Sequence, residues 1–77
     1  MELSPRLAAV AALVPPGARL ADVGTDHAYL PAYLILNGRI QRSIAAEICP
    51  GPLDHARRTA AAYPLDDRLQ FRPRADL

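Results

Sequence analysis

Two acidic residues and a glycine lie close together where an apolar run of the chain gives way to a polar turn. Asp22 lies near the end of the run that begins at Arg19, Gly24 forms the turn, and Asp26 follows it. Glycine lets the backbone reverse tightly and approach a ligand, because no Cβ is in the way. The two carboxylates can accept hydrogen bonds from hydroxyl groups and attract an ammonium or sulfonium group. These residues therefore favour a nucleoside with a cationic tail.

The turn differs from the glycine-rich loop of dinucleotide-binding proteins. That loop has the pattern G-x-G-x-x-G, and its bare backbone amides face a pyrophosphate at a helix N-terminus. Here Asp26 stands at the second glycine position, and Ala28 and Tyr29 follow. A carboxylate at that place would repel a diphosphate. An NAD-type dinucleotide-binding unit is the alternative, and NAD binding would identify it.

A third acid is spaced as expected for a ribose contact. Glu47 follows a second apolar run and lies 23 positions after Gly24. In α/β nucleotide-binding folds, an acid about 20 residues after the glycine turn accepts hydrogen bonds from the ribose hydroxyls. Glu47 therefore strengthens the prediction of a nucleoside site at the carboxyl edge of a sheet.

Helices and strands must alternate to bring these residues together. Ser4 and Pro5 are a typical N-cap and first helical residue, and Asn37-Gly38 is a typical helix end. Apolar spacing predicts a lead-in helix from Pro5 to Val14, which Pro15 ends, and a strand from Ala18 or Arg19 to Val23. It further predicts a helix from about Pro31 to Leu36, a strand over 43–48, a helix over 53–63 and a strand over 68–72.

Two local features complete this α/β prediction. The first strand is almost continuously apolar, which is typical of a strand covered on both faces. The segment Cys49-Pro50-Gly51-Pro52 is interpreted as a rigid turn before the next helix.

Length and composition limit the class of protein. The chain has 77 residues, enough for one small domain, which buries only about 60% of the surface that its unfolded form exposes. Its net charge is +1 and all nine of its basic residues are arginines, a bias that we attribute to a GC-rich genome. This charge gives no strong field for nucleic acid.

Cysteine usage and hydropathy indicate a cytoplasmic protein. Cys49 is the only cysteine, which excludes an internal disulfide and fits a reducing compartment. No run approaches the ~20 apolar residues of a membrane span, and no export signal is recognisable. His27, Cys49 and His55 lack zinc-ligand spacing, so no metal is expected.

Several motifs resemble the N-terminal part of the bacterial tRNA (adenine-22-N1)-methyltransferase family, over nearly the whole chain. They are LS-x-RL at residues 3–7, ADVGTDHAYLP at 21–31, LNG at 36–38 and AAE-x-x-x-GP at 45–52. The resemblance implies a Rossmann-like class I methyltransferase fold with an incomplete parallel sheet. Residues 1–77 would be the N-terminal fragment of its domain, with the remaining strands and a C-terminal helical domain absent.

The same resemblance implies S-adenosylmethionine as cofactor and N1 of adenine 22 in tRNA as methyl acceptor. Arg6, His27 and Tyr29 would line the cleft for the base, and Asp26 and Arg6 would be catalytic. The expected cofactor contacts are Asp22, Gly24, Thr25, Asp26, His27, Glu47, Ile48 and Asp76. Asp76 departs from the family pattern, because the Gly-Asp-Gly-like segment usual after the third strand is absent here.

A third function class is a small non-catalytic protein. Such a chain would bind a nucleoside or self-associate through the apolar sheet edge left after the third strand. It would fold alone, whereas a fragment would aggregate or fold only in part. The sequence predicts no particular oligomeric state.

Overall fold

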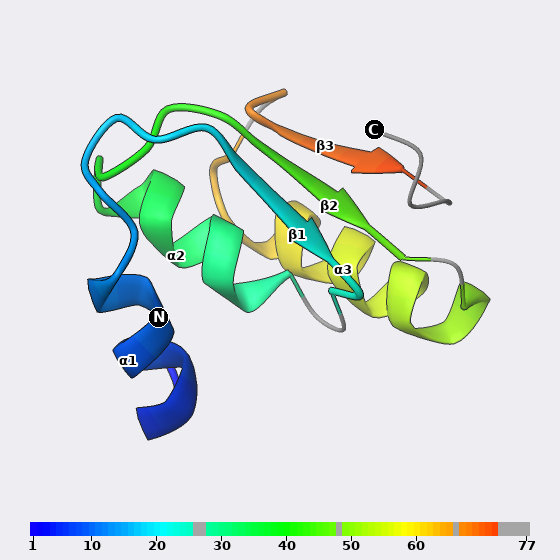
Figure 1. Cartoon of the computed structure of the whole chain (residues 1–77). Coiled ribbons are helices and arrows are strands. Elements are labelled where there is room, and N and C mark those ends of the chain that lie inside the picture. Colours follow the sequence, from blue (N-terminus) through cyan, green and yellow to red (C-terminus); the bar gives the residue numbers. More distant parts are fainter. Residues whose placement is uncertain (26–27, 48, 66, 73–77) are drawn as a thin grey trace.

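The computed structural model describes residues 1–25, 28–47, 49–65 and 67–72. Over these residues three helices alternate with three strands (Figure 1). The elements are α1 (Pro5–Ala12), β1 (Leu20–Val23), α2 (Tyr29–Leu36), β2 (Ser43–Ala46), α3 (Pro50–Ala62) and β3 (Leu69–Arg72).

The strands form one parallel sheet in the order β1-β2-β3, as the sequence predicts. Ser43 at the start of β2 pairs with Leu20 on one side and Leu69 on the other, so the three strands begin level. Because the strands are also equally long, they end level. We call the edge where the strands end the carboxyl rim and the edge where they begin the amino rim.

The helices lie on one side of the sheet. α2 and α3 pack against the same face, and α1 packs on α2 (Figure 1). The opposite face is open, and Val23 in β1 is 57% exposed. The expected cover on both faces of this strand is therefore wrong for the described residues, because no helix among them crosses to the second face.

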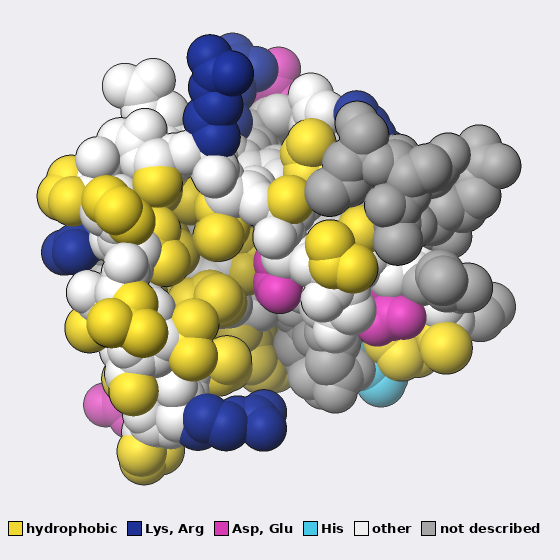
Figure 2. All heavy atoms as spheres, in the orientation of Figure 1, with side chains coloured by type: hydrophobic (Ala, Val, Ile, Leu, Met, Phe, Trp, Pro, Cys, Tyr) yellow, Lys and Arg dark blue, Asp and Glu magenta, His cyan; other side chains and the backbone are white. Residues whose placement is uncertain are grey.

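The core centres on α2. Most side chains of α2 are buried, because the helix lies between α1, α3 and the sheet. Figure 2 shows hydrophobic side chains gathered over the part of the molecule that holds α1 and α2. None of the described helices combines the length and hydropathy that a membrane crossing needs. The largest fully buried side chains are Leu34, Ile35, Ile40, Leu65 and Pro31.

Most element ends follow the predicted signals. Ser4 caps α1, since its Oγ accepts a hydrogen bond from the Leu7 amide at 3.3 Å. Gly38 follows α2 with a φ of +71°, the left-handed conformation that glycine adopts without strain. β2 ends at Ala46, two residues earlier than predicted, and β3 begins at Leu69.

The start of α3 differs from the prediction. The segment from Pro50 to Pro52 was expected to be a turn, but it forms the first turn of the helix. Proline is tolerated there because the first amides of a helix have no intrahelical acceptor and its fixed φ suits the helix. The helix consequently begins almost directly after the end of β2.

Candidate functional site

The glycine turn and the predicted ribose-binding acid lie side by side at the carboxyl rim. The amide of Gly24 donates to the carbonyl oxygen of Ala46 at 2.8 Å, and the amide of Thr25 donates to the same oxygen at 3.2 Å. Since Glu47 directly follows Ala46, the end of β1 is tied to the residue that precedes this acid. Gly24 has a φ of +75°, which turns the chain away from the sheet.

Glu47 is held at the rim by backbone on both sides. Its amide donates to the carbonyl oxygen of Arg72 at 3.0 Å, which extends the contact between β2 and β3. Its carboxylate Oε2 accepts from the amide of Cys49 at 3.2 Å, next to the start of α3. The half-buried side chain therefore has a defined place close to the turn.

Asp22 is the second acid of this rim, and it is half-buried. Burial raises the pKa of its carboxyl group above the usual value of about 3.8, and the nearby negative charge of Glu47 raises it further. The Thr25 side chain offsets part of this increase. Asp22 pairs with Ala45, two residues before Glu47, so the two acids lie near the ends of adjacent strands.

The turn has both the space and an unsatisfied polar group for a ligand. A Cβ added at Gly24 would have no heavy atom within 4 Å. Thr25 is only 3% exposed, and its Oγ1 interacts with the Asp22 carboxyl group but forms no hydrogen bond of good geometry with the described residues. A ligand or water can therefore supply a better partner for this buried hydroxyl. These features fit the hydroxyl-rich and cationic cofactor that the sequence suggests.

Ala28 is a feature of the site that sequence reasoning missed. It has a φ of +57° and is the only non-glycine among the described residues with a positive φ. For alanine this left-handed conformation costs roughly 1–2 kcal/mol. Strained backbone of this kind clusters at functional sites, and Ala28 lies between the glycine turn and α2. Alanine gives no sequence signal for it, whereas glycine or asparagine would.

The remaining predicted site residues divide into two groups. Arg6 is exposed in the first turn of α1, and Tyr29 is 42% exposed as the first residue of α2. No described contact joins these two side chains, so the structure does not test their shared cleft. The other group, which comprises Asp26, His27, Ile48 and Asp76, lies outside the described residues.

The described residues do not gather in a way that suits a metal. Among them, no three His, Cys, Asp or Glu side chains come close enough to hold an ion.

The chain was compared with known families and structures. A family model described as "Methyltransferase domain" matches residues 3–77. The chain belongs to this methyltransferase family. The resemblance found in the sequence motifs is thereby confirmed.

Individual relatives agree with this assignment. The tRNA (adenine(22)-N(1))-methyltransferase of Bacillus subtilis (strain 168) is 43% identical over 72 residues, which cover 94% of this chain and 30% of that protein. The structure of M. capricolum TrmK in complex with S-adenosyl-homocysteine is 37% identical, with a TM-score of 0.84 over 92% of this chain and 31% of that one.

A third relative confirms the Rossmann-like fold. A Streptococcus agalactiae protein of the NADB-Rossmann superfamily is 43% identical, with a TM-score of 0.89 over 94% of this chain and 32% of that one. The chain thus spans about a third of the length of the relatives it matches, 30% to 32%.

Proposed function

We propose that this chain is the cofactor-binding portion of a methyltransferase that uses S-adenosylmethionine and modifies N1 of adenine 22 in tRNA. The observation that carries the proposal is the pair of hydrogen bonds from Gly24 and Thr25 to Ala46, which puts Glu47 beside the turn. The similarity to the Bacillus subtilis enzyme supports the choice of tRNA. A tRNA substrate would place the protein in the cytoplasm.

Each described residue of the rim has a proposed role in holding the cofactor. Glu47 would accept hydrogen bonds from the two ribose hydroxyls, and Asp22 would attract the amino group of the methionine part. The open space at Gly24 would let the ligand approach the backbone, and Thr25 Oγ1 would gain a hydrogen-bond partner. Asp26, His27, Ile48 and Asp76 are proposed as further contacts on the family resemblance alone.

The cofactor, when bound, supplies an electrophilic methyl group on a sulfonium. The protein must then orient the acceptor base in line with that methyl group and exclude water. Arg6, His27 and Tyr29 are proposed to line the cleft for the base. Since N1 is hidden in a base pair, the adenine must be unpaired or flipped out when it enters.

Asp26 is proposed to act on the charge that develops in the base. When the N1 lone pair forms the new bond to carbon, a positive charge appears on the adenine. A nearby carboxylate can stabilise this charge or relieve it by accepting a proton. Arg6 would contribute by holding the base or an adjacent phosphate in place.

The proposed cofactor site can be tested with two matched glycine variants. Gly24→Ala and Gly38→Ala both put alanine at a φ above +70° where an added Cβ meets no atom, so the strain, roughly 1–2 kcal/mol, should be similar. We expect Gly24→Ala alone to weaken S-adenosylmethionine binding, about tenfold or more, as measured by isothermal titration calorimetry. Only Gly24 lies at the carboxyl rim.

The same titration separates the competing functions. Binding of NAD in place of S-adenosylmethionine would identify a dinucleotide-binding protein. Equal losses of affinity in the two glycine variants would show that the effect comes from stability, and the proposed site would be wrong.

The role of Asp26 can be tested in a complete methyltransferase that carries this chain. If Asp26 acts on the developing charge, Asp26→Ala should lower kcat by about 10²-fold or more and change the Kd of S-adenosylmethionine much less. Methylation of a tRNA transcript with adenine or guanine at position 22 provides the assay and its control. A loss in kcat no larger than the loss in cofactor affinity would leave Asp26 a binding residue only.

A further inference from the structure

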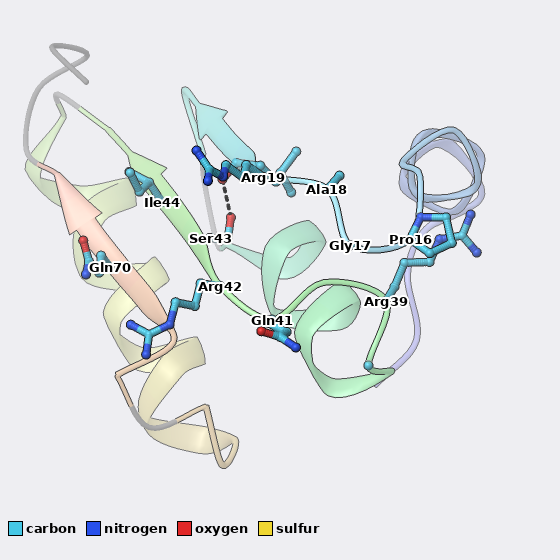
Figure 3. A pocket seen from close by; sticks show the side chains of 12 residues that line it. Pro16, Gly17, Ala18, Arg19, Arg39, Gln41, Arg42, Ser43, Ile44 and Gln70 are labelled. Atoms are coloured by element: carbon cyan, nitrogen blue, oxygen red, sulfur yellow. Dashed lines mark hydrogen bonds between the residues drawn. The ribbon is translucent and has the colours of Figure 1, made fainter.

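The rim opposite the candidate cofactor site contains a cavity that the proposed function does not use. It has a volume of about 670 Å³ and lies where the strands begin (Figure 3). Its walls come from the segment 16–20 before and within β1, the segment 38–44 that enters β2, and Gln70 of β3. The cavity reaches only the first residues of β1 and β2, whereas the candidate cofactor site follows their last residues, Val23 and Ala46.

The cavity is strongly basic. Arg19, Arg39 and Arg42 all line it, whereas no acidic residue does among those that the structure describes. Arg39 is anchored, because its Nε donates to the carbonyl oxygen of Val14 at 2.8 Å and its own carbonyl accepts from the amide of Gly17 at 2.7 Å. Arg19 and Arg42 are exposed and form no ion pair with the described residues. Within the described part of the chain, the cavity therefore holds two guanidinium groups without a carboxylate partner beside a fixed third one.

The register of the sheet places the two exposed arginines on adjacent segments. Leu20 pairs with Ser43, so Arg19 and Arg42 occupy neighbouring positions directly before β1 and β2. Their guanidinium groups lie apart at the cavity, with Arg19 beside β1 (Figure 3). One ligand with more than one anionic or polar group can therefore contact both. Figure 3 shows the Arg42 side chain extending from the start of β2 toward β3.

The other lining residues suit a ligand that is more than a bare ion. Leu20 and Ile44 provide apolar surface, and Gln41 and Gln70 provide amide groups. Ser43 does not belong to this ligand-binding set, since its Oγ already donates to the carbonyl oxygen of Leu20 at 2.9 Å. Amide groups can pair with base edges or sugar hydroxyls, while guanidinium groups pair with phosphate through two hydrogen bonds.

We propose that the cavity at the amino rim binds phosphate groups carried by a nucleotide unit, with Arg19 and Arg42 as the anion-binding side chains. The unit is either part of an RNA strand or a free nucleotide, because both offer the same phosphate and sugar chemistry. The acids Asp22 and Glu47 make the carboxyl rim unsuitable for the same ligand. This inference is independent of the proposed methyl transfer, since no residue is shared between the two sites.

The test uses the ¹⁵N-labelled 77-residue chain, titrated with inorganic phosphate, ATP and a single-stranded RNA octamer while its amide resonances are recorded. We expect saturable shifts at Gly17, Gln41 and Gln70, and none at Gly24. Arg42→Gln and Arg19→Gln should each weaken binding about threefold to tenfold and lower the salt dependence of RNA binding by about 0.7 in log–log slope. Arg58→Gln, which removes an exposed charge from α3, is the matched control.

The outcomes separate the sources and decide the proposal. RNA binding that is at least tenfold tighter than ATP binding identifies an RNA strand as the source, and similar affinities identify a free nucleotide. Equal weakening by Arg58→Gln would mean that only net charge matters, and the site would be rejected. Shifts centred on the carboxyl rim, no saturable shift, or the narrow amide dispersion of an unfolded chain would likewise overturn it, because the cavity requires the sheet.

Discussion

Asp22, which we propose as a cofactor contact, carries a charge that opposes folding. Burial and the charge of Glu47 raise its pKa in the native state above the usual value of about 3.8. At pH values between the pKa of Asp22 in the unfolded state and its raised pKa in the native state, the native state binds more protons than the unfolded state does. The free energy of unfolding therefore falls as the pH rises through this interval and stays at the lower level above it. Above this interval the half-buried carboxylate is charged and its cost is fully present.

We predict that Asp22→Asn increases the free energy of unfolding at neutral pH. The amide keeps the shape of the side chain but carries no charge, so the desolvation penalty disappears. The gain should shrink as the pH falls toward 4, where Asp22 of the parent chain becomes protonated as well. Urea denaturation followed by circular dichroism between pH 4 and 8 measures this difference. The same variant should bind S-adenosylmethionine more weakly.

Asp54 offers a control for this prediction. It is exposed on α3, so Asp54→Asn changes the net charge by the same amount without removing a buried carboxylate. If both variants gain the same stability at neutral pH, then net charge and not the burial of Asp22 explains the result.

The residues of the candidate site differ in how far the sequence alone predicts their positions and conformations. Gly24 and Glu47 could be predicted because a turn after an apolar run, and an acid at a fixed spacing from it, are local features. The conformation of Ala28 could not, because alanine has no preference for a positive φ. The neighbouring positions of Arg19 and Arg42 were not predicted either. They depend on how β1 and β2 are aligned, and the sequence of two short strands does not determine this alignment.

At the scale of elements, the strand and helix order was predictable and the ends were less so. Apolar runs bounded by proline and glycine gave all three strands and all three helices of the described residues in the correct order. The start of α3 was wrong because Pro50-Gly51-Pro52 has the composition of a turn, although prolines are acceptable in a first helical turn. Composition alone does not separate these two uses of proline.

α2 is the element on which the remaining structure depends. It contacts α1, α3 and two strands, and Leu34 within it is only 1% exposed. We predict that Leu34→Ala lowers the free energy of unfolding by about 2–5 kcal/mol, through lost burial and the cavity left behind. A 77-residue chain has a total of about 4 to 12 kcal/mol, so this change should leave much of the protein unfolded. Chemical denaturation provides the measurement.

Leu13 provides the matched control for this substitution. It directly follows α1 and is 81% exposed. Leu13→Ala removes the same atoms from an exposed position and should change stability by less than about 0.5 kcal/mol. A Leu34→Ala variant as stable as Leu13→Ala would mean that α2 is not the centre of the core.

At the scale of the whole molecule, the described helices cover only one face of the sheet. The helices cover one side, while Ala21 and Val23 of β1 are exposed on the other. β1 is also an edge strand, so its outer backbone groups are available for pairing. β3, the other edge, has polar Gln70 and Arg72 alternating with its inward residues. Among the described residues, apolar side chains are thus exposed on β1, and association through the edge after the third strand stays a prediction.

We predict that the isolated 77-residue chain associates through this exposed part of β1. Val23→Lys should reduce the association, because an edge lysine adds charge repulsion between paired copies and removes apolar surface. Sedimentation velocity over a range of concentrations would measure the change, with circular dichroism to confirm that the variant keeps its secondary structure. Leu13→Lys makes the same kind of replacement at the end of α1, away from the sheet. If Leu13→Lys reduces association as much as Val23→Lys does, general hydrophobicity rather than the edge of β1 drives it.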